Sequence, residues 1–460
     1  MVRRVWLGLL PVLALTAGPV AAQDEFSLKV EDSRLVQNLR DGKKPLRDSS
    51  GNIPPENQKA IDAVAHYEMM RITSEVNRGL KPGNVEKAPD LVKQAADYLL
   101  VIENPQGSTN PKRYSESQKD FIQAYGKACV ANLRTVLGTP DKPSKFEPFV
   151  RINACRLLAT VARSGYEECA DLAVEIIDNP KESDGVRYYC LQALKNLFAA
   201  YNVDFPEKSV ITKADRELKA VQSLINFIMR KPAVNENTPA DEVEALRYIR
   251  REAVRALGYV RKPIYRTDKT VVAVPALVLL KVAAIDTSIQ PTPSLSERVE
   301  ATLGYLQLTP DRQENMDYAV FYLGKITRDL AKEFNDKQVF AVDPKATPKD
   351  SLSLTYRDYY AWKYGAARLE AGLKSWKATW DTENPAAPQP ASKLMTDLVA
   401  KANDYVYGPI TGLTSGNKTI DGTVIDDWVT QQLNAGVFAN TMLFKDLPDD
   451  PAYKIAYPNP

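Results

Sequence analysis

Arginines at a recurring spacing are the residues of this chain whose type and pattern point to a definite chemistry. In four segments an arginine is followed three positions later by a small residue and, four positions beyond that, by a bulky apolar or aromatic one. A guanidinium group is planar, always charged and suited to bind a carboxylate through two parallel hydrogen bonds. The expected chemistry is therefore recognition of acidic groups. The four patterns are Arg151-Ala154-Leu158, Arg187-Cys190-Leu194, Arg250-Ala253-Leu257 and Arg298-Ala301-Tyr305.

Two hypotheses account for these arginines. In the first, which we favour, each arginine pairs with a carboxylate of the chain itself and helps to hold neighbouring segments together. In the second, the arginines form a basic stripe, widened by further arginines nearby, that binds an acidic partner. The candidate binding residues under the second hypothesis are Arg187, Arg247, Arg250, Arg251, Arg255 and Arg298.

Histidine chemistry is largely excluded, because His66 is the only histidine of the chain. A histidine-cluster metal site or an H-E-x-x-H hydrolase needs at least two histidines, and a catalytic triad would need His66 itself. His66 stands beside Tyr67 in an expected helix, where we predict a structural or exposed role. We therefore predict no catalytic residue, no metal ligand and no cofactor, and expect that the protein is not an enzyme.

The segment 412–419 partly matches a phosphate-binding loop. Such a loop requires a glycine, four residues, then G-K-[ST], with a strand before it and a helix after it. Here only three residues separate Gly412 from Gly416, Asn417 precedes Lys418, and no apolar strand comes before. We interpret the segment as a surface turn.

The four cysteines, Cys129, Cys155, Cys169 and Cys190, fall within one stretch of the chain. An exported protein could oxidise them. However, Cys190 occupies the small-residue position of its pattern and Cys155 directly follows that position, so we favour buried packing thiols over a structural disulfide. No C-x-x-C pair is present, which makes a zinc site an unfavoured interpretation.

The first 22 residues have the pattern of a signal peptide. Arg3 and Arg4 precede an apolar stretch, and Val20-Ala21-Ala22 supplies small residues before Gln23. The alternative is a retained anchor. Cleavage removes two arginines and no acidic residue, which leaves 58 basic and 58 acidic residues. A neutral chain has no global field for nucleic acid. We predict a periplasmic or secreted protein without nucleic-acid partners and without a membrane span in the mature chain.

Helical periodicity dominates the rest of the sequence. Apolar residues recur three and four positions apart over 56–80, 88–102 and 167–178, which predicts amphipathic helices. The strongly apolar stretch 271–285 is predicted to be a buried helix. Between residues 23 and 55 the chain is polar and punctuated by Gly and Pro, so we predict an extended lead-in.

The four arginine segments resemble the second helix of a HEAT repeat. They are 36, 63 and 48 residues apart, against a period of about 40–47 for such units, and the long interval implies an insertion near 201–215. The resemblance implies that each arginine pairs with an aspartate of a neighbouring turn, for which Asp178 and Asp184 are candidates. It also implies an all-α superhelical solenoid of HEAT-like helix pairs, with a helical C-terminal extension. The expected organisation is a signal peptide (1–22), an extended polar lead-in (23–55), the HEAT-like α-solenoid (56–340) and a helical extension with a turn-rich tail (341–460).

Aromatic residues mark the beginning of the C-terminal extension. Seven large or apolar residues follow one another at spacings of three and four, which places them on one face of a helix. We predict that this stripe packs on the last repeat as core, whereas the alternative is an exposed seam for a partner helix or a carbohydrate. The stripe consists of Tyr359, Trp362, Ala366, Leu369, Leu373, Trp376 and Trp380.

The favoured function is a non-enzymatic scaffold outside the cytoplasm that binds a protein or peptide along its concave face. The resemblance also allows a ligand carrier or enzyme of the bilin-lyase kind, because some HEAT-repeat proteins attach chromophores. A third possibility is a structural element of the cell envelope. A shallow continuous groove would favour the scaffold, and a deep aromatic cleft with convergent polar groups would favour the carrier or enzyme.

Overall fold

The computed structural model describes most of the chain downstream of the expected signal peptide, which lies outside the described residues. Side chains are described except at 87–89, 337–340, 348–360 and 381. The described residues are 26–74, 77, 87–100, 114–139, 141–200, 209–235, 237–267, 270–340, 348–381, 393–412, 420–435 and 442–456.

Helices account for most of this structure, so the predicted all-α class is confirmed. The single sheet among the described residues is an antiparallel pair of short strands, β1 (Tyr265–Thr267) and β2 (Thr270–Ala273). The expected buried helix over 271–285 is wrong in its first part, because it begins only at Pro275. Proline has no N–H to donate and suits the first turn of a helix, while the β-branched residues before it join the strand.

The N-terminal helices include one that the sequence pattern missed. Residues 23–55 were expected to be extended, but α1 (Val30–Arg40) lies within them and buries Val36 and Leu39. Its contact with the next helix supplies the apolar surroundings that a short polar helix lacks on its own. The following elements are α2 (Pro55–Met70), the 3-10 turn η1 (Arg71–Thr73), α3 (Lys87–Ala96) and α4 (Glu116–Leu137).

The middle of the chain contains the four arginine segments. Each of them lies in a helix, namely α5, α7, α9 and α11. Each interval between these helices contains a further helix, α6, α8 or α10, and α8 packs on α6 and α9. Residues 201–208 of the predicted insertion lie outside the described residues. The helices of this part are α5 (Pro148–Ala162), α6 (Cys169–Ile177), α7 (Asp184–Ala199), α8 (Ala214–Met229), α9 (Ala240–Gly258), α10 (Pro275–Ala283) and α11 (Leu295–Leu306).

The C-terminal part is more helical than the expected turn-rich tail. Helix α16 (Thr423–Asn434) was not predicted, and it buries Ile425, Trp428 and Val429 against α12 and α14. The other elements are α12 (Met316–Phe340), α13 (Pro348–Asp381), α14 (Lys393–Ala402), the π-helical turn η2 (Asn403–Tyr407), α15 (Gly408–Gly412) and the 3-10 turn η3 (Pro451–Tyr453).

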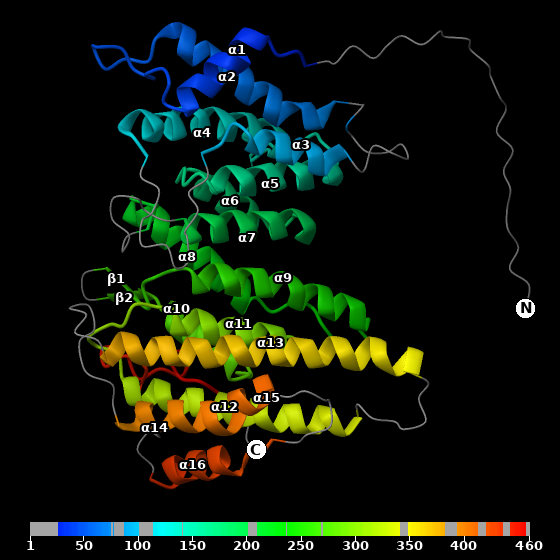
Figure 1. Cartoon of the computed structure of the whole chain (residues 1–460), viewed down its shortest axis with the longest axis vertical. Helices are drawn as coiled ribbons and strands as arrows, with labels where there is room; N and C mark the ends of the chain where they lie inside the picture. Colours follow the sequence, from blue (N-terminus) through cyan, green and yellow to red (C-terminus); the bar gives the residue numbers. More distant parts are fainter. Residues whose placement is uncertain are drawn as a thin grey trace, which may run out of the picture.

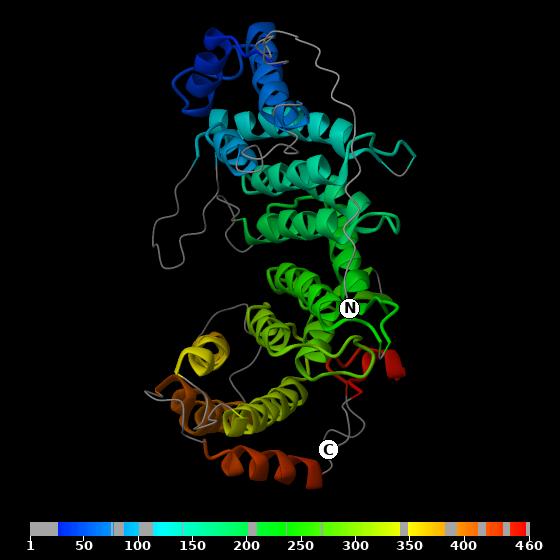
Figure 2. The same ribbon diagram turned by 90° about the vertical axis from the view of Figure 1, so that its right-hand side faces the viewer.

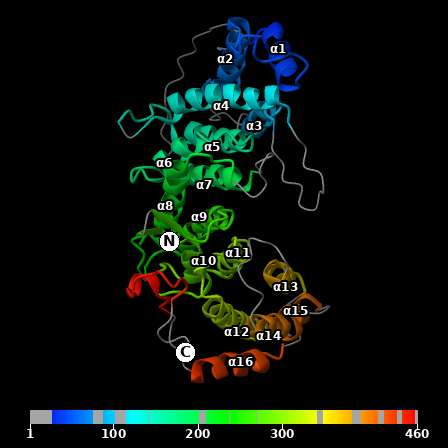
Figure 3. The same cartoon turned by 90° about the vertical axis from the view of Figure 1, so that its left-hand side faces the viewer.

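The helices form an elongated stack (Figure 1). In the series α1, α2, α4, α5, α7, α9, α11 and α13, each helix packs on the next. Helices α6, α8 and α10 lie on one side of α5, α7, α9 and α11, and α13 stands beside α11 on the other side (Figure 3). The apolar core is continuous from α1 to α16.

The contact between α9 and α11 is unusually close because two glycines face each other. A Cβ added to Gly258 would lie 2.7 Å from the Cα of Gly304, and one added to Gly304 would lie 2.8 Å from the Cα of Gly258. Real side chains do not approach a backbone so closely. The two helices therefore touch backbone to backbone at this point.

The aromatic stripe is core, as predicted. Trp362, Trp376 and Trp380 are 7%, 3% and 4% exposed, and the ring of Trp376 lies against Tyr305 of α11. The side chain of Tyr359 lies outside the described ones. The C-terminal segment 442–456 returns to α10 on the side of the stack opposite α13, as the red and yellow ribbons of Figure 2 show.

Candidate functional site

Two of the six candidate arginines are inside the protein. Arg250 is 4% exposed, and its Nε donates to Glu297 Oε1 at 2.6 Å while Nη2 donates to the carbonyl of Pro291 at 2.7 Å. Arg298 is 2% exposed and pairs with Glu333 through Nη1 at 2.9 Å. Both side chains tie one layer of the stack to the next, and neither presents its guanidinium at the surface.

The two earlier arginine segments also pair within the chain. Arg151 pairs with Glu182, from the turn before α7. Arg187 donates from Nη1 to Asp184 Oδ1 at 3.1 Å and from Nη2 to the carbonyl of Asn179. Asp184 is thus a partner as expected, whereas Asp178 accepts a hydrogen bond from Ser223 instead. The expected aspartate partner is wrong for Arg151, Arg250 and Arg298, each of which pairs with a glutamate.

Arg255 belongs to a chain of ion pairs that crosses four helices. Its Nη1 and Nη2 donate to Glu252 at 2.6 Å and Glu300 at 2.9 Å. Lys195 of α7 pairs with Glu252, and Arg368 of α13 pairs with Glu300. Burial raises the pKa of Glu300, but hydrogen bonds from Arg368 and Arg255 lower that pKa overall. Arg255 is therefore fully engaged in joining α7, α9, α11 and α13.

The remaining candidates, Arg247 and Arg251, line an open hollow that we call the arginine cleft. It has a volume of about 860 Å³ and lies between α9, the start of α11, α12 and the first half of α13. The two arginines are four residues apart, so they lie on the same face of α9. The cleft is lined by Glu244, Arg247, Tyr248, Arg251, Pro293, Ser294, Leu295, Ser296, Glu333, Ala361 and Trp362.

The two cleft arginines differ in how far they are already paired. Arg247 donates to the carbonyl of Thr292 at 2.9 Å and pairs with Glu244. Arg251 lies over the ring of Tyr248, 4.7 Å from its centroid, and makes a long hydrogen bond of 3.4 Å to Ser296 Oγ. Among the described residues no carboxylate lies within ion-pair distance of Arg251. Arg251 thus holds the charge of the cleft that no described carboxylate neutralises.

A line of aromatic rings extends the cleft across the stack. Tyr248 is 48% exposed and stacks on Tyr188 of α7, with ring centroids 5.3 Å apart and an interplanar angle of 23°. Tyr188 contacts Tyr189 edge to face, and Arg156 of α5 lies over the ring of Tyr189. The surface therefore continues from the cleft along α9, α7 and α5.

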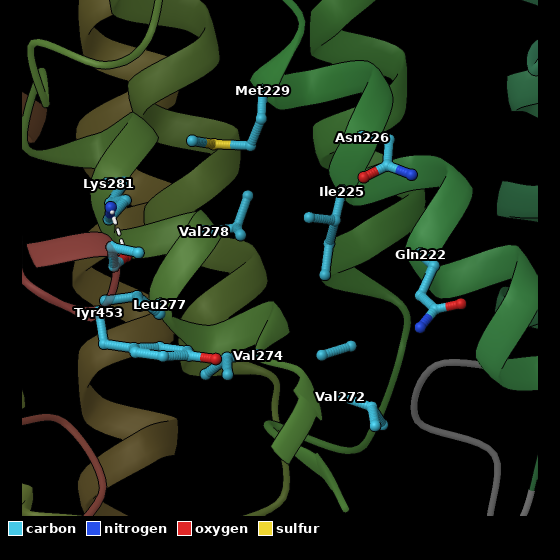
Figure 4. Close-up of a pocket in the computed structure, with 12 residues that line it drawn as sticks. Gln222, Ile225, Asn226, Met229, Val272, Val274, Leu277, Val278, Lys281 and Tyr453 are labelled. Atoms are coloured by element: carbon cyan, nitrogen blue, oxygen red, sulfur yellow. Dashed lines mark hydrogen bonds between the residues drawn. The ribbon is translucent and has the colours of Figure 1, made fainter. Parts of the chain in front are cut away.

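A second hollow lies on the other side of the stack and is called the tail pocket here. It has a volume of about 510 Å³ and is lined mainly by apolar side chains of α8, β2 and α10, including Ile225, Met229 and Val278 (Figure 4). Lys281 lies at one end and donates to the carbonyl of Ala452 at 2.9 Å. The C-terminal segment thus forms one wall of the pocket.

Chemistry of other kinds has little support among the described residues. His66 is exposed and its Nδ1 lies 2.9 Å from Asn132 Oδ1. The four cysteines are buried and none forms a disulfide, in agreement with the prediction of packing thiols, and Cys155 Sγ lies 3.3 Å from Cys190 Sγ. In the described part of the chain, no group of three or more His, Cys, Asp or Glu is placed to hold a metal ion. No helix there combines the length and apolar character that crossing a bilayer requires.

The sequence pattern missed the aromatic and hydroxyl side chains of the cleft. Tyr188 and Tyr248 are 60 residues apart in the sequence. Only the packing of α7 on α9 brings them together. Ser296 belongs to the turn after Ser294, which caps α11 by accepting from the backbone N–H of Glu297. The S-L-S-E run was a readable capping signal, but it gave no sign that the turn faces Arg251.

Comparison of the chain with protein-family models, with curated proteins and with solved structures found no match in any of the three.

Proposed function

We propose that the stack is a HEAT-like α-solenoid and that its function is to bind a protein or peptide outside the cytoplasm, without catalysis. In this proposal α5, α7, α9 and α11 are the second helices of successive repeats. Each carries an arginine pattern, which begins at the fourth residue of α5, α7 and α11 and in the second half of α9, and each packs on the next one along the row. Residues 56–340 are then the repeat array, and the later helices cover its C-terminal end.

The arginine cleft and its tyrosine line are the observation that carries the binding function. Arginine, tyrosine and tryptophan are the residue types that contribute most to binding energy in protein interfaces. The surface is elongated, because the rings of Tyr248, Tyr188 and Tyr189 continue it from α9 to α7. An extended peptide fits such a surface better than a small compact ligand does.

Photo-cross-linking tests this proposal. A benzophenone amino acid replaces Ala361, an exposed residue of the cleft rim, and in a control chain it replaces Gln123, an exposed residue of α4. We expect a discrete protein adduct from position 361 in cells that make the protein, and none from position 123. Equal adducts from both positions, or none from either, would count against a binding site in the cleft.

Export is part of the proposal and has a separate test. Residues 1–22 have the charge, apolar stretch and small residues of a cleaved signal peptide. N-terminal sequencing of the mature protein is expected to begin at Gln23 or within a few residues of it. Intact protein that retains Met1 in the envelope would contradict cleavage, and recovery from the cytosol would contradict export.

The tail pocket favours a second candidate, a carrier of a small apolar ligand. Its walls are mostly aliphatic, with Lys281 and Tyr453 on one side and the amides of Gln222 and Asn226 on the other (Figure 4). Pockets of this size and character are typical of small-molecule sites. Native mass spectrometry of the purified protein tests this candidate, since a bound molecule should be lost when Val278→Trp fills the pocket.

A further inference from the structure

We propose that Arg251 is the position at which the cleft recognises its partner, and that it does so by binding a carboxylate side chain of a short acidic-and-apolar peptide segment. This inference rests on the proposed peptide-binding function and names the chemistry of the ligand.

The first step is the charge balance of the cleft. Two carboxylates, Glu244 and Glu333, line it, and each is paired with a different arginine, Arg247 and Arg298. Arg251 has no such partner among the described residues, although it stands four positions from Arg247 on the same helix face. Like charges at this spacing are mildly destabilising. An acidic group from outside would remove that repulsion.

The second step is the orientation of the guanidinium group. Arg251 lies over the face of Tyr248, whose ring is itself stacked on Tyr188. A guanidinium that stacks on an aromatic face keeps its N–H donors in the ring-parallel plane, directed away from the ring. The long bond to Ser296 Oγ occupies Nη1, and Nε is buried, so Nη2 is the donor that remains for a ligand. Because the stacked rings hold the side chain in place, little side-chain entropy is lost when a carboxylate binds.

The third step is the reason why a peptide is a better ligand for the cleft than a polyanion such as a nucleic acid. A single guanidinium without an ion-pair partner, in a cleft that two carboxylates also line, suits one acidic side chain. The closely spaced phosphates of a nucleic acid would also meet the negative charges of Glu244 and Glu333. Leu295, Ala361 and Trp362 also line the cleft and supply apolar wall. These walls suit an aliphatic or aromatic neighbour of the acidic residue in the peptide.

The experiment uses an oriented library of peptides of about nine residues, with the central residue fixed as Glu, Gln, Lys or phosphoserine. The purified full chain is immobilised, and captured peptides are quantified by mass spectrometry. We expect about tenfold enrichment of the Glu set over the Gln set, as a charge-assisted hydrogen bond provides. With Arg251→Ala that preference is expected to fall to within about twofold, and with Arg251→Lys to an intermediate value.

Two controls locate the effect. Arg312→Ala removes the same charge from an exposed residue outside the cleft and should leave the Glu preference unchanged. Ala361→Trp fills the cleft and should abolish capture of every set. Thermal melts of all variants exclude unfolding as the cause of lost capture.

The outcomes separate the two proposals. Capture that Ala361→Trp abolishes, but with Glu and Gln sets equal, would overturn the role of Arg251 and leave the peptide-binding cleft standing. Absence of any capture by the intact chain would overturn both. Preference for phosphoserine, or tight binding of a single-stranded oligonucleotide added as a competitor, would replace the carboxylate by a phosphate ligand and so contradict the inference.

Discussion

Helix α9 presents two arginines, adjacent in sequence, to two very different surroundings. Arg250 faces α11, where it is 4% exposed and held by Glu297 and the carbonyl of Pro291. Arg251 faces the arginine cleft, where a tyrosine ring and one hydroxyl are its contacts. Successive residues of a helix point about 100° apart. One step along the chain thus separates an arginine that joins layers from an arginine that has no ion-pair partner among the described residues.

We call the contact of α9 with α11 the closed side and the arginine cleft the open side. The two differ in how closely the helix backbones approach each other. On the closed side Gly258 and Gly304 let α9 and α11 touch, so no space remains between the helices. On the open side α12 and α13 stand away from α9, and the space between them is the cleft. The same type of side chain is therefore enclosed between layers on one side and lines an open hollow on the other.

The largest expected effect comes from emptying the buried aromatic site between α13 and α11. Trp376 is 3% exposed and packs against Tyr305 of α11. Trp376→Ala should lower the free energy of unfolding by about 3–5 kcal/mol, the usual cost of a large buried aromatic side chain. Tyr248→Ala, on the open side, should cost less than about 1 kcal/mol. Urea denaturation of both variants measures the difference, and similar losses would break the distinction between the buried site and the open side.

The two neighbouring arginines allow the most direct comparison. Arg250→Ala leaves Glu297, which is 0% exposed, without its charge partner and should cost about 3 kcal/mol. Arg251→Ala should change stability by no more than about 0.5 kcal/mol. Unfolding monitored by circular dichroism checks both values. If Arg250→Ala melted like the unaltered protein, the arginine would have to be reassigned to recognition.

The glycine contact sharpens the comparison at the backbone level. Gly304→Ala should push α11 from α9 and cost about 2 kcal/mol, because the new Cβ would lie 2.8 Å from the Cα of Gly258. Gly412→Ala is a suitable control, since nothing lies within 4 Å of the Cβ position there. Thermal unfolding of the two variants is the measurement. Equal melting temperatures would show that the helices can separate without loss.

The smallest expected effect is a pH dependence of the stability, which arises from Glu314 in the segment after α11. Burial raises the pKa of Glu314 to about 7, and the hydroxyl of Tyr305 donates to its Oε1 at 2.6 Å. The folded protein therefore holds this proton more tightly than the unfolded chain does. The stabilising contribution of the protonated group is complete below about pH 4.5 and is lost as the pH rises through 7.

Glu314→Gln removes this titration and tests its sign. The unfolding free energy of the variant, relative to that of the unaltered protein, should increase by roughly 1–2 kcal/mol from pH 5 to pH 8. This is less than the full pKa shift would give, because the residue is only half-buried. Denaturant midpoints of both proteins at the two pH values give the difference. If the variant were instead relatively more stable at pH 5 than at pH 8, the fold would favour the carboxylate and not the protonated acid.

Local patterns in the sequence predicted more of the fold than of the cleft. Period-three-and-four spacing located the helices around Cys169–Ile177 and the buried stripe of Trp362, Trp376 and Trp380, because these signals lie within one element. It missed α1, whose apolar residues are few and depend on α2 for burial. It also placed a helix over β2, where β-branched residues before a proline prefer extended backbone.

The candidate site depended on information that no local pattern contains. All six arginines were predicted as one set, since residue type and spacing are alike. In the folded protein some of these arginines are in buried pairs, one joins a chain of ion pairs, and two line the cleft. Which of these surroundings an arginine has depends on which helix packs on its face of the helix. Tyr188 and Ser296 reach the cleft from other elements, so their contribution became visible only in the folded protein.

The return of the C-terminal segment to the middle of the stack has a consequence for how the protein comes apart. Arg266 pairs with Asp446, Lys281 donates to Ala452, and the backbone N–H of Ala456 donates to Asp286. An open row of helices can fray from either end, one layer at a time. Here α11 to α16 lie inside a loop whose two ends are fastened to each other. Under a pulling force or limited proteolysis, the C-terminal half should therefore release as one cooperative unit, after the layers at the N-terminal end have already opened.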